Sequence, residues 1–122
     1  MIKACILFDE NDKPFGFRIG GHAGFEASGR DIMCAAVSIL AYTFLESVAE
    51  LTNEPFVSEV DEAHGLIRFR FKEKPLHEGR LLFQALLEGL RMINEEYGEE
   101  FLHVRKYRRS NGTFTKINDQ EV

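Results

Sequence analysis

Residues 20–38 have the sequence GGHAGFEASGRDIMCAAVS and separate a short extended run from a long apolar one. The glycines of this segment tolerate positive φ and favour a loop around His22. Cys34 falls at the start of the apolar run, whose length and spacing predict a helix over residues 31–51. The loop can therefore fold the imidazole of His22 back over the end of that helix, as in a thiol nucleophile paired with its base.

The flanking sequence predicts strands on both sides of this helix. Alternating apolar and polar residues predict five strands, over residues 2–8, 15–19, 56–60, 66–72 and 101–108. Leucines at helical spacing predict a second helix that starts near residue 76 and stops at Gly98. The order β-β-α-β-β-α-β predicts one α+β domain over residues 1–122, layered, with a largely antiparallel sheet.

The first predicted helix differs from the second in how its apolar residues are distributed. They go nearly all the way round, which predicts a helix held in the core between the sheet and another element. Basic residues gather in two segments, 68–72 and 105–109, and are interpreted together as a solvated strand face plus a charged tail.

The composition indicates one globular domain with an acidic balance. Of 122 residues, 44% are hydrophobic, which is enough for a single core, and the net charge of −5 argues against general binding to nucleic acid and suits a basic partner. The longest apolar stretch, residues 32–45, is shorter than the about 20 residues that span a bilayer, and no amino-terminal signal precedes it. Cys5 and Cys34 lack a disulfide spacing, so we expect a cytoplasmic protein with reduced thiols.

Two helix starts are compatible with the residues before Cys34. If Asp31 is the N-cap, Cys34 is the third helical residue, where unpaired N–H groups and the helix dipole stabilise a thiolate. If Ser28 is the cap and Asp31 its capping-box partner, Cys34 lies about one turn deeper and the effect is weaker. In both cases Ser38 shares a helix face with Cys34, where its hydroxyl can hydrogen-bond the sulfur or a substrate carbonyl.

Asp31 and the loop have supporting roles in this interpretation. A carboxylate close to a thiol raises the pKa of that thiol and opposes its activation, so we expect Asp31 to cap the helix or to orient His22. The loop is rich in small residues and can move as a lid over the site. Its members are Gly21, Ala23, Gly24, Phe25 and Gly29.

Structural explanations exist for the same residues. On composition alone, a cysteine in an apolar helix is more often a small core residue than a nucleophile, and a histidine in a glycine loop is more often merely exposed. A thiol redox sensor would need a resolving cysteine near Cys34, and the sequence has none there. We predict no metal site and no cofactor, because the other histidines lack a metal-ligand spacing to either cysteine; they are His64, His77 and His103.

At these residues the sequence resembles the bacterial ribosomal-processing cysteine protease family. The shared pattern is Gly-His-Ala, a short loop and Gly-x-Asp-Ile-x-Cys-Ala-Ala-Val-Ser, which here begins at Gly21 and ends at Ser38 without a departure. The resemblance implies that Cys34 is the nucleophile and His22 the proton-transfer partner of a Cys/His dyad. Enzymes of this family remove a short amino-terminal extension from ribosomal large-subunit protein twenty-seven, cutting after an aromatic residue. The resemblance also implies a homodimer.

The leading hypothesis is therefore a cytoplasmic cysteine endopeptidase that processes a ribosomal large-subunit protein precursor. It needs no cofactor, membrane or direct nucleic-acid partner, and the strongly basic substrate fits the acidic balance of the chain. The alternative is a noncatalytic ribosome-associated module in which the loop and the acidic surface hold a basic peptide and Cys34 only packs. The reactivity of Cys34 separates the two, since a histidine-paired thiolate is alkylated at lower pH than a packed thiol.

Overall fold

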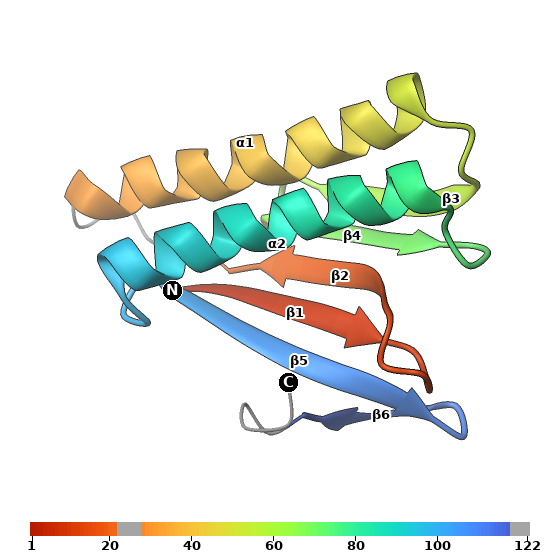
Figure 1. Ribbon diagram of the computed structural model, residues 1–122. Helices are drawn as coiled ribbons and strands as arrows, with labels where there is room; N and C mark the ends of the chain where they lie inside the picture. The colour runs from red at the N-terminus through yellow and green to blue at the C-terminus, as the bar shows by residue number, and fades with distance from the viewer. Residues whose placement is uncertain (22–27, 118–122) are drawn as a thin grey trace.

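The computed structural model describes residues 1–21 and 28–117, which form one sheet with two helices on the same face (Figure 1). The elements follow in the order β1 (Ile2–Phe8), β2 (Pro14–Gly20), α1 (Ser28–Leu51), β3 (Phe56–Asp61), β4 (Leu66–Phe71), α2 (His77–Tyr97), β5 (Leu102–Ser110) and β6 (Thr113–Lys116). The predicted order of seven elements is confirmed, and β6 follows it as an additional strand.

The sheet has the strand order β3-β4-β2-β1-β5-β6. Three hairpins, β1–β2, β3–β4 and β5–β6, supply antiparallel pairs, and β2 also pairs antiparallel with β4. β1 and β5 pair in parallel, with Ile2 opposite Leu102 and Phe8 opposite Arg108. The predicted α+β class with a largely antiparallel sheet is confirmed.

The turns of two hairpins follow from their sequences. In the β1–β2 turn, Oδ1 of Asp9 accepts hydrogen bonds from the N–H groups of Asn11, at 2.8 Å, and Lys13, at 3.0 Å. In the β5–β6 turn, Asn111 and Gly112 have φ values of 51° and 80°. Asparagine and glycine both tolerate positive φ, which two-residue hairpin turns require. The basic residues 105–109 therefore lie on β5 rather than in a tail, and the chain that follows them returns along β5 as β6.

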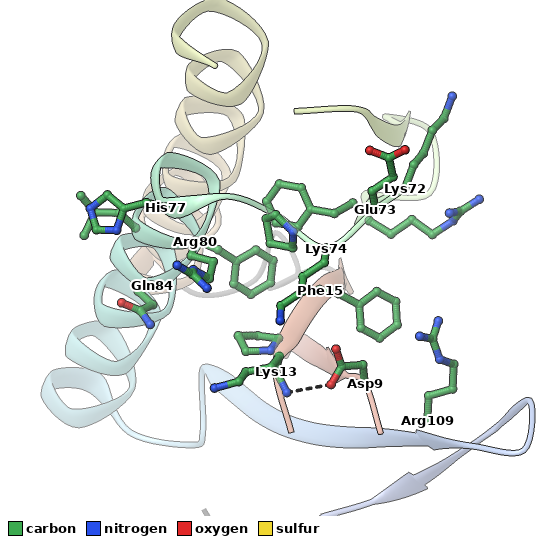
Figure 2. Close-up of a pocket in the computed structure, with 16 residues that line it drawn as sticks. Asp9, Lys13, Phe15, Lys72, Glu73, Lys74, His77, Arg80, Gln84 and Arg109 are labelled. Atoms are coloured by element: carbon green, nitrogen blue, oxygen red, sulfur yellow. Dashed lines mark hydrogen bonds between the residues drawn. The ribbon is translucent and has the colours of Figure 1, made fainter. Parts of the chain in front are cut away.

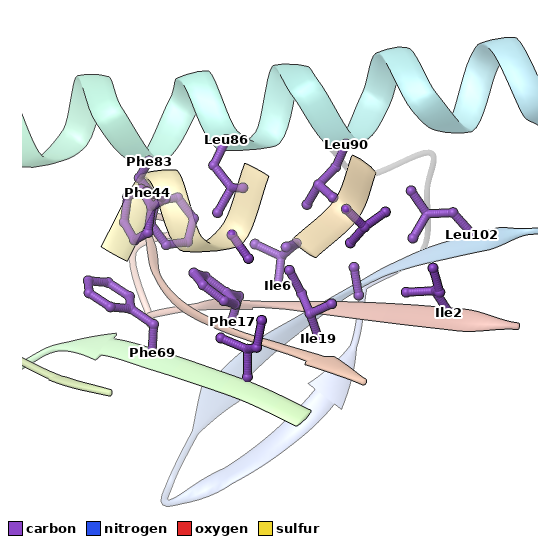
Figure 3. Packing of buried hydrophobic residues seen from close by; sticks show 14 of the residues in the cluster. Ile2, Ile6, Phe17, Ile19, Phe44, Phe69, Phe83, Leu86, Leu90 and Leu102 are labelled. Atoms are coloured by element: carbon purple, nitrogen blue, oxygen red, sulfur yellow. The ribbon is translucent and has the colours of Figure 1, made fainter. Parts of the chain in front are cut away.

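The core lies between the sheet and the helices and is centred on phenylalanines. On β1 and β4 the predicted alternation is confirmed, because every second residue is buried, as in Ile67, Phe69 and Phe71. Phe44 of α1 packs edge-on against Phe69, with ring centroids 4.7 Å apart, and against Phe83 of α2, at 5.4 Å (Figure 3). These aromatic contacts join both helices to the sheet.

α1 buries only one of its faces. The buried residues recur every three or four positions and are Met33, Val37, Ala41, Phe44 and Val48. Ile32 and Ile39 are 67% and 62% exposed. The prediction of a helix held between the sheet and another layer is wrong, because α2 lies beside α1 on the same face of the sheet rather than above it (Figure 1).

The apolar part of α1 is also longer than the sequence interpretation assumed. Ile32–Leu51 is a helix of 20 residues that is long and apolar enough to cross a membrane by length and composition. The expectation of a stretch too short for a span is therefore wrong on that criterion. The same criterion is met by core helices of globular proteins, and here Val37, Phe44 and Val48 pack into the domain core.

Candidate functional site

Cys34 lines a cavity of about 200 Å³ near the beginning of β1 and the end of β2. Three parts of the chain enclose this cavity: the strand ends, the first half of α1 and the turn between β3 and β4. Much of the wall is apolar and consists of Ile2, Ile19, Val37, Leu66 and Ile67. The cavity thus joins a thiol to a small apolar recess, which we call the Cys34 cavity.

Cys34 and Ser38 are both half-buried and both line the Cys34 cavity. The prediction that they share a helix face is confirmed, because four residues make about one helical turn. Their arrangement places a hydroxyl beside the same space that the thiol faces.

The start of α1 excludes one of the two helix starts that are compatible with the sequence, the one with Asp31 as N-cap. α1 begins at Ser28, so Cys34 lies beyond the first four residues, whose N–H groups lack partners within the helix. Asp31 lies inside the first turn and is not the N-cap. Cys34 therefore lies deeper in the helix than it would with Asp31 as the N-cap. The positive end of the helix dipole accordingly stabilises a thiolate at Cys34 less strongly than that helix start implied.

Part of the predicted site lies outside the described residues. This holds for His22, Ala23, Gly24 and Phe25, and for the side chain of Asp31. The Cys/His dyad, the lid and the role of Asp31 accordingly stay predictions. Gly29, which was expected in the loop, belongs to α1.

Gly21 is the last described residue before that segment, and its conformation requires glycine. Its φ is +95°, and a Cβ atom there would collide with the carbonyl oxygen of Met1. Gly21 lines the Cys34 cavity together with Cys34 itself. Gly21 is therefore the last described residue of the cavity wall before the segment that holds His22 in the sequence.

Three polar residues of the cavity are not predicted by the sequence motif: Tyr42, Asp61 and Glu62. Tyr42 lies two turns after Cys34 on α1, so helical spacing could have found it. Asp61 ends β3 and Glu62 begins the β3–β4 turn, and no local pattern links them to Cys34.

Asp61, the last residue of β3, is held as a carboxylate beside the β3–β4 turn. Its Oδ2 lies 2.8 Å from Nδ1 of His64, and a hydrogen bond from His64 lowers the pKa of Asp61 below its ordinary value. Among the described residues that line the Cys34 cavity there are two carboxylates and neither lysine nor arginine. The cavity is therefore apolar inside and acidic at the turn.

The described residues offer no alternative centre for metal or disulfide chemistry. Within residues 1–21 and 28–117, no group of three or more histidine, cysteine or acidic side chains gathers closely enough to hold a metal ion. Both cysteines of the chain are described, and neither forms a disulfide. Cys5 lines a separate depression with Leu7 and Phe114, so it takes no part in the Cys34 cavity.

Comparison with known proteins gives consistent matches over most of the chain. The family model described as cysteine protease Prp matches residues 1–101. The ribosomal processing cysteine protease Prp of Staphylococcus aureus is 29% identical over 99 residues, which cover 81% of this chain and 93% of that protein. The protein of the same name from Bacillus subtilis is 30% identical over 90 residues, which cover 74% of this chain and 80% of the B. subtilis protein.

Solved structures show the same fold. The crystal structure of the essential ribosomal processing protease Prp from S. aureus with a substrate peptide has a TM-score of 0.80 and 26% identity. Its complex with a covalently linked product peptide has a TM-score of 0.77 and 27% identity. Each match covers 87% of this chain and 99% of the other.

Proposed function

Because this chain belongs to the cysteine protease Prp family and is a cysteine protease, we propose that it removes a short amino-terminal extension from a ribosomal large-subunit protein. The observation that carries this proposal is the Cys34 cavity, in which a half-buried thiol faces a recess that also includes Gly21. The next residue is His22, the expected proton-transfer partner.

The proposed mechanism follows from a Cys34/His22 dyad. The thiolate of Cys34 attacks the scissile carbonyl, and His22 as imidazolium protonates the leaving amine. Water then hydrolyses the acyl-enzyme, with His22 acting as the base. In this proposal Asp31 orients His22, and the loop with Gly24 and Phe25 closes over the peptide.

Ser38 is proposed to assist at the scissile carbonyl. Cys34 lies beyond the unpaired N–H groups of α1, so the helix end supplies less stabilisation of an oxyanion than the sequence implied. The hydroxyl of Ser38 lines the same cavity one turn further on and can donate a hydrogen bond there. This makes Ser38 a supporting residue and not part of the dyad.

The cavity also supports the proposed substrate. Its apolar wall, which includes Ile19, Val37 and Leu66, suits an aromatic side chain next to the cleaved bond. Asp61 and Glu62 at the β3–β4 turn suit the basic residues of a ribosomal protein. We therefore propose cleavage after an aromatic residue in a basic precursor.

The test is cleavage of a peptide that spans the extension and the first mature residues of the ribosomal protein, with products identified by mass. We expect one cut after an aromatic residue with the wild-type chain and with Cys5→Ala, and none with Cys34→Ala. Retained cleavage by Cys34→Ala contradicts the mechanism. Binding of the peptide without cleavage by the wild type supports the noncatalytic binding module instead.

We also propose a cytoplasmic location and a homodimer. An exposed apolar stripe on α1 supports the dimer, because Ile32, Ala35 and Ile39 follow one another at helical spacing on its outer side. Light scattering should give the mass of two chains for the wild type and of one chain for Ile39→Glu. A monomeric wild type contradicts this part of the proposal.

A further inference from the structure

A second and larger pocket lies at the opposite end of the strands from the Cys34 cavity. Its volume is about 550 Å³, and it is enclosed by the β1–β2 turn, the end of β4 and the first turns of α2 (Figure 2). Its inner wall includes the buried apolar residues Phe71, Pro75 and Phe83. We call it the α2 pocket. Its size falls in the range of pockets that bind small molecules.

The α2 pocket is basic although the chain is acidic. Six cationic side chains line it against two carboxylates, in a chain whose net charge is −5; the cations are Lys13, Arg70, Lys72, Lys74, Arg80 and Arg109. Figure 2 shows the side chains of Lys74 and Arg80 directed toward the same space, with Lys13 on its other side. Lys13 comes from the β1–β2 turn, whereas Lys74 and Arg80 come from the start of α2 and the residues just before it, so the fold brings two distant parts of the chain together.

The cations at the centre of this pocket are not neutralised within the described residues. No ion pair joins Lys13, Lys74 or Arg80 to a carboxylate in residues 1–21 and 28–117. Asp9, one of the two acidic residues of the wall, already accepts hydrogen bonds from two N–H groups of its own turn. Like charges that gather without counterions repel one another, and a bound anion would offset this repulsion.

We propose that the α2 pocket binds a phosphate group. A phosphate offers several acceptor oxygens and up to two negative charges, which match an arginine and two lysines that approach from different directions better than a single carboxylate does. The group can belong to a nucleotide, for which the pocket has room beside its apolar wall, or to the backbone of RNA. The pocket is separate from the proposed peptidase site, so the proposal does not depend on that function.

The experiment measures binding of a short fluorescein-labelled oligouridylate by polarisation, at several salt concentrations, with AMP and inorganic phosphate as competitors. The test variant is Lys74→Gln/Arg80→Gln, and the matched control is Lys3→Gln/Lys116→Gln, which removes the same charge from exposed positions outside the pocket. All four substituted side chains are exposed, and thermal melting checks that both variants remain folded.

We expect the test variant to bind at least about tenfold more weakly and the control to bind like the wild type. The log of the association constant falls linearly with the log of the salt concentration, with a slope of about −0.7 for each phosphate contact to a single strand. Because the test variant loses two such contacts, the magnitude of this slope should decrease by about 1.4. Competition by AMP at lower concentration than inorganic phosphate identifies a nucleotide site, and tighter binding of the oligonucleotide than of AMP identifies an RNA backbone. Three results would overturn the proposal. The first is that the test and control variants bind the oligonucleotide equally weakly, and the second is that no probe binds. The third is that a polyglutamate peptide competes as well as the phosphate compounds do.

Discussion

Ser38 is placed so that its contribution to catalysis can be measured apart from that of Cys34. It lies one turn further along α1 and lines the same cavity. We expect Ser38→Ala to lower kcat/KM for the precursor peptide by up to about tenfold, the worth of one hydrogen bond, without abolishing cleavage. Thr43→Ala, at an exposed position of the same helix, should cleave at the wild-type rate. An unchanged rate in Ser38→Ala assigns the hydroxyl to packing alone.

Gly21 combines a positive φ with a close approach to the first residue of the chain. Gly21→Ala should lower the free energy of unfolding by about 1 to 3 kcal/mol, because the added Cβ is strained by φ and also collides with the carbonyl of Met1. Urea denaturation measures this change.

Gly112 provides the matched control for Gly21. Its φ is +80°, but a Cβ atom there would meet nothing within 4 Å. Gly112→Ala should therefore lower the free energy of unfolding through backbone strain alone, without a collision like the one at Met1. Equal losses in the two variants would mean that the Met1 contact costs nothing.

Residue spacing predicted only the part of the site that lies on one helix. Cys34 and Ser38 were found together because helical geometry relates positions four apart. Asp61 and Glu62 approach them from the β3–β4 turn, which reaches the cavity only through the pairing of β4 with β2. That pairing is a long-range contact, and no local pattern in the sequence specifies it.

At the scale of elements, Phe44 is the contact through which α1 is fixed to the rest of the fold. Its ring meets Phe69 of β4 and Phe83 of α2 edge-on. Phe44→Ala should cost about 3 to 5 kcal/mol in urea denaturation, since the neighbouring rings cannot close the cavity. Leu51→Ala, at a position 71% exposed on the same helix, should change stability by less than about 0.5 kcal/mol. Similar losses at both positions would contradict this account of the core.

The elements that sequence patterns predicted well are those with strict periodicity. Every second residue of β1 and β4 is buried, and α2 buries Leu86 and Leu90 as its leucine spacing indicated, whereas Leu82 and Ile93 of the same spacing are half-buried. β6 was missed although Asn111 and Gly112 are typical of a two-residue hairpin turn. The basic residues before that turn drew the interpretation toward a tail, whereas Phe114 of β6 stacks with Phe15 of β2, with ring centroids 6.4 Å apart.

At the scale of the whole molecule, charge is separated between the two ends of the sheet. The Cys34 cavity carries Asp61 and Glu62 at one end, and the α2 pocket carries Lys13, Lys74 and Arg80 at the other. If the substrate is basic, raising the salt concentration from about 0.05 M to about 0.5 M should lower kcat/KM several-fold and leave kcat unchanged, because screening weakens association only.

A peptide with glutamines in place of its basic residues is the control for the salt experiment. Its kcat/KM should depend little on salt. The same salt dependence for both peptides would show that the carboxylates of the Cys34 cavity do not attract the substrate.

The parallel pairing of β1 with β5 has a consequence for how the protein is synthesised. β1 is translated long before its parallel partner β5, and residues 9–101 lie between them. The β1–β2 hairpin therefore emerges with a bare edge that stays open while residues 9–101 are made. Strand pairs so distant in sequence close slowly, because the intervening residues must be ordered before the pairing is gained. A nascent chain that has not yet released β5 into solution therefore has an incomplete sheet and no finished protease.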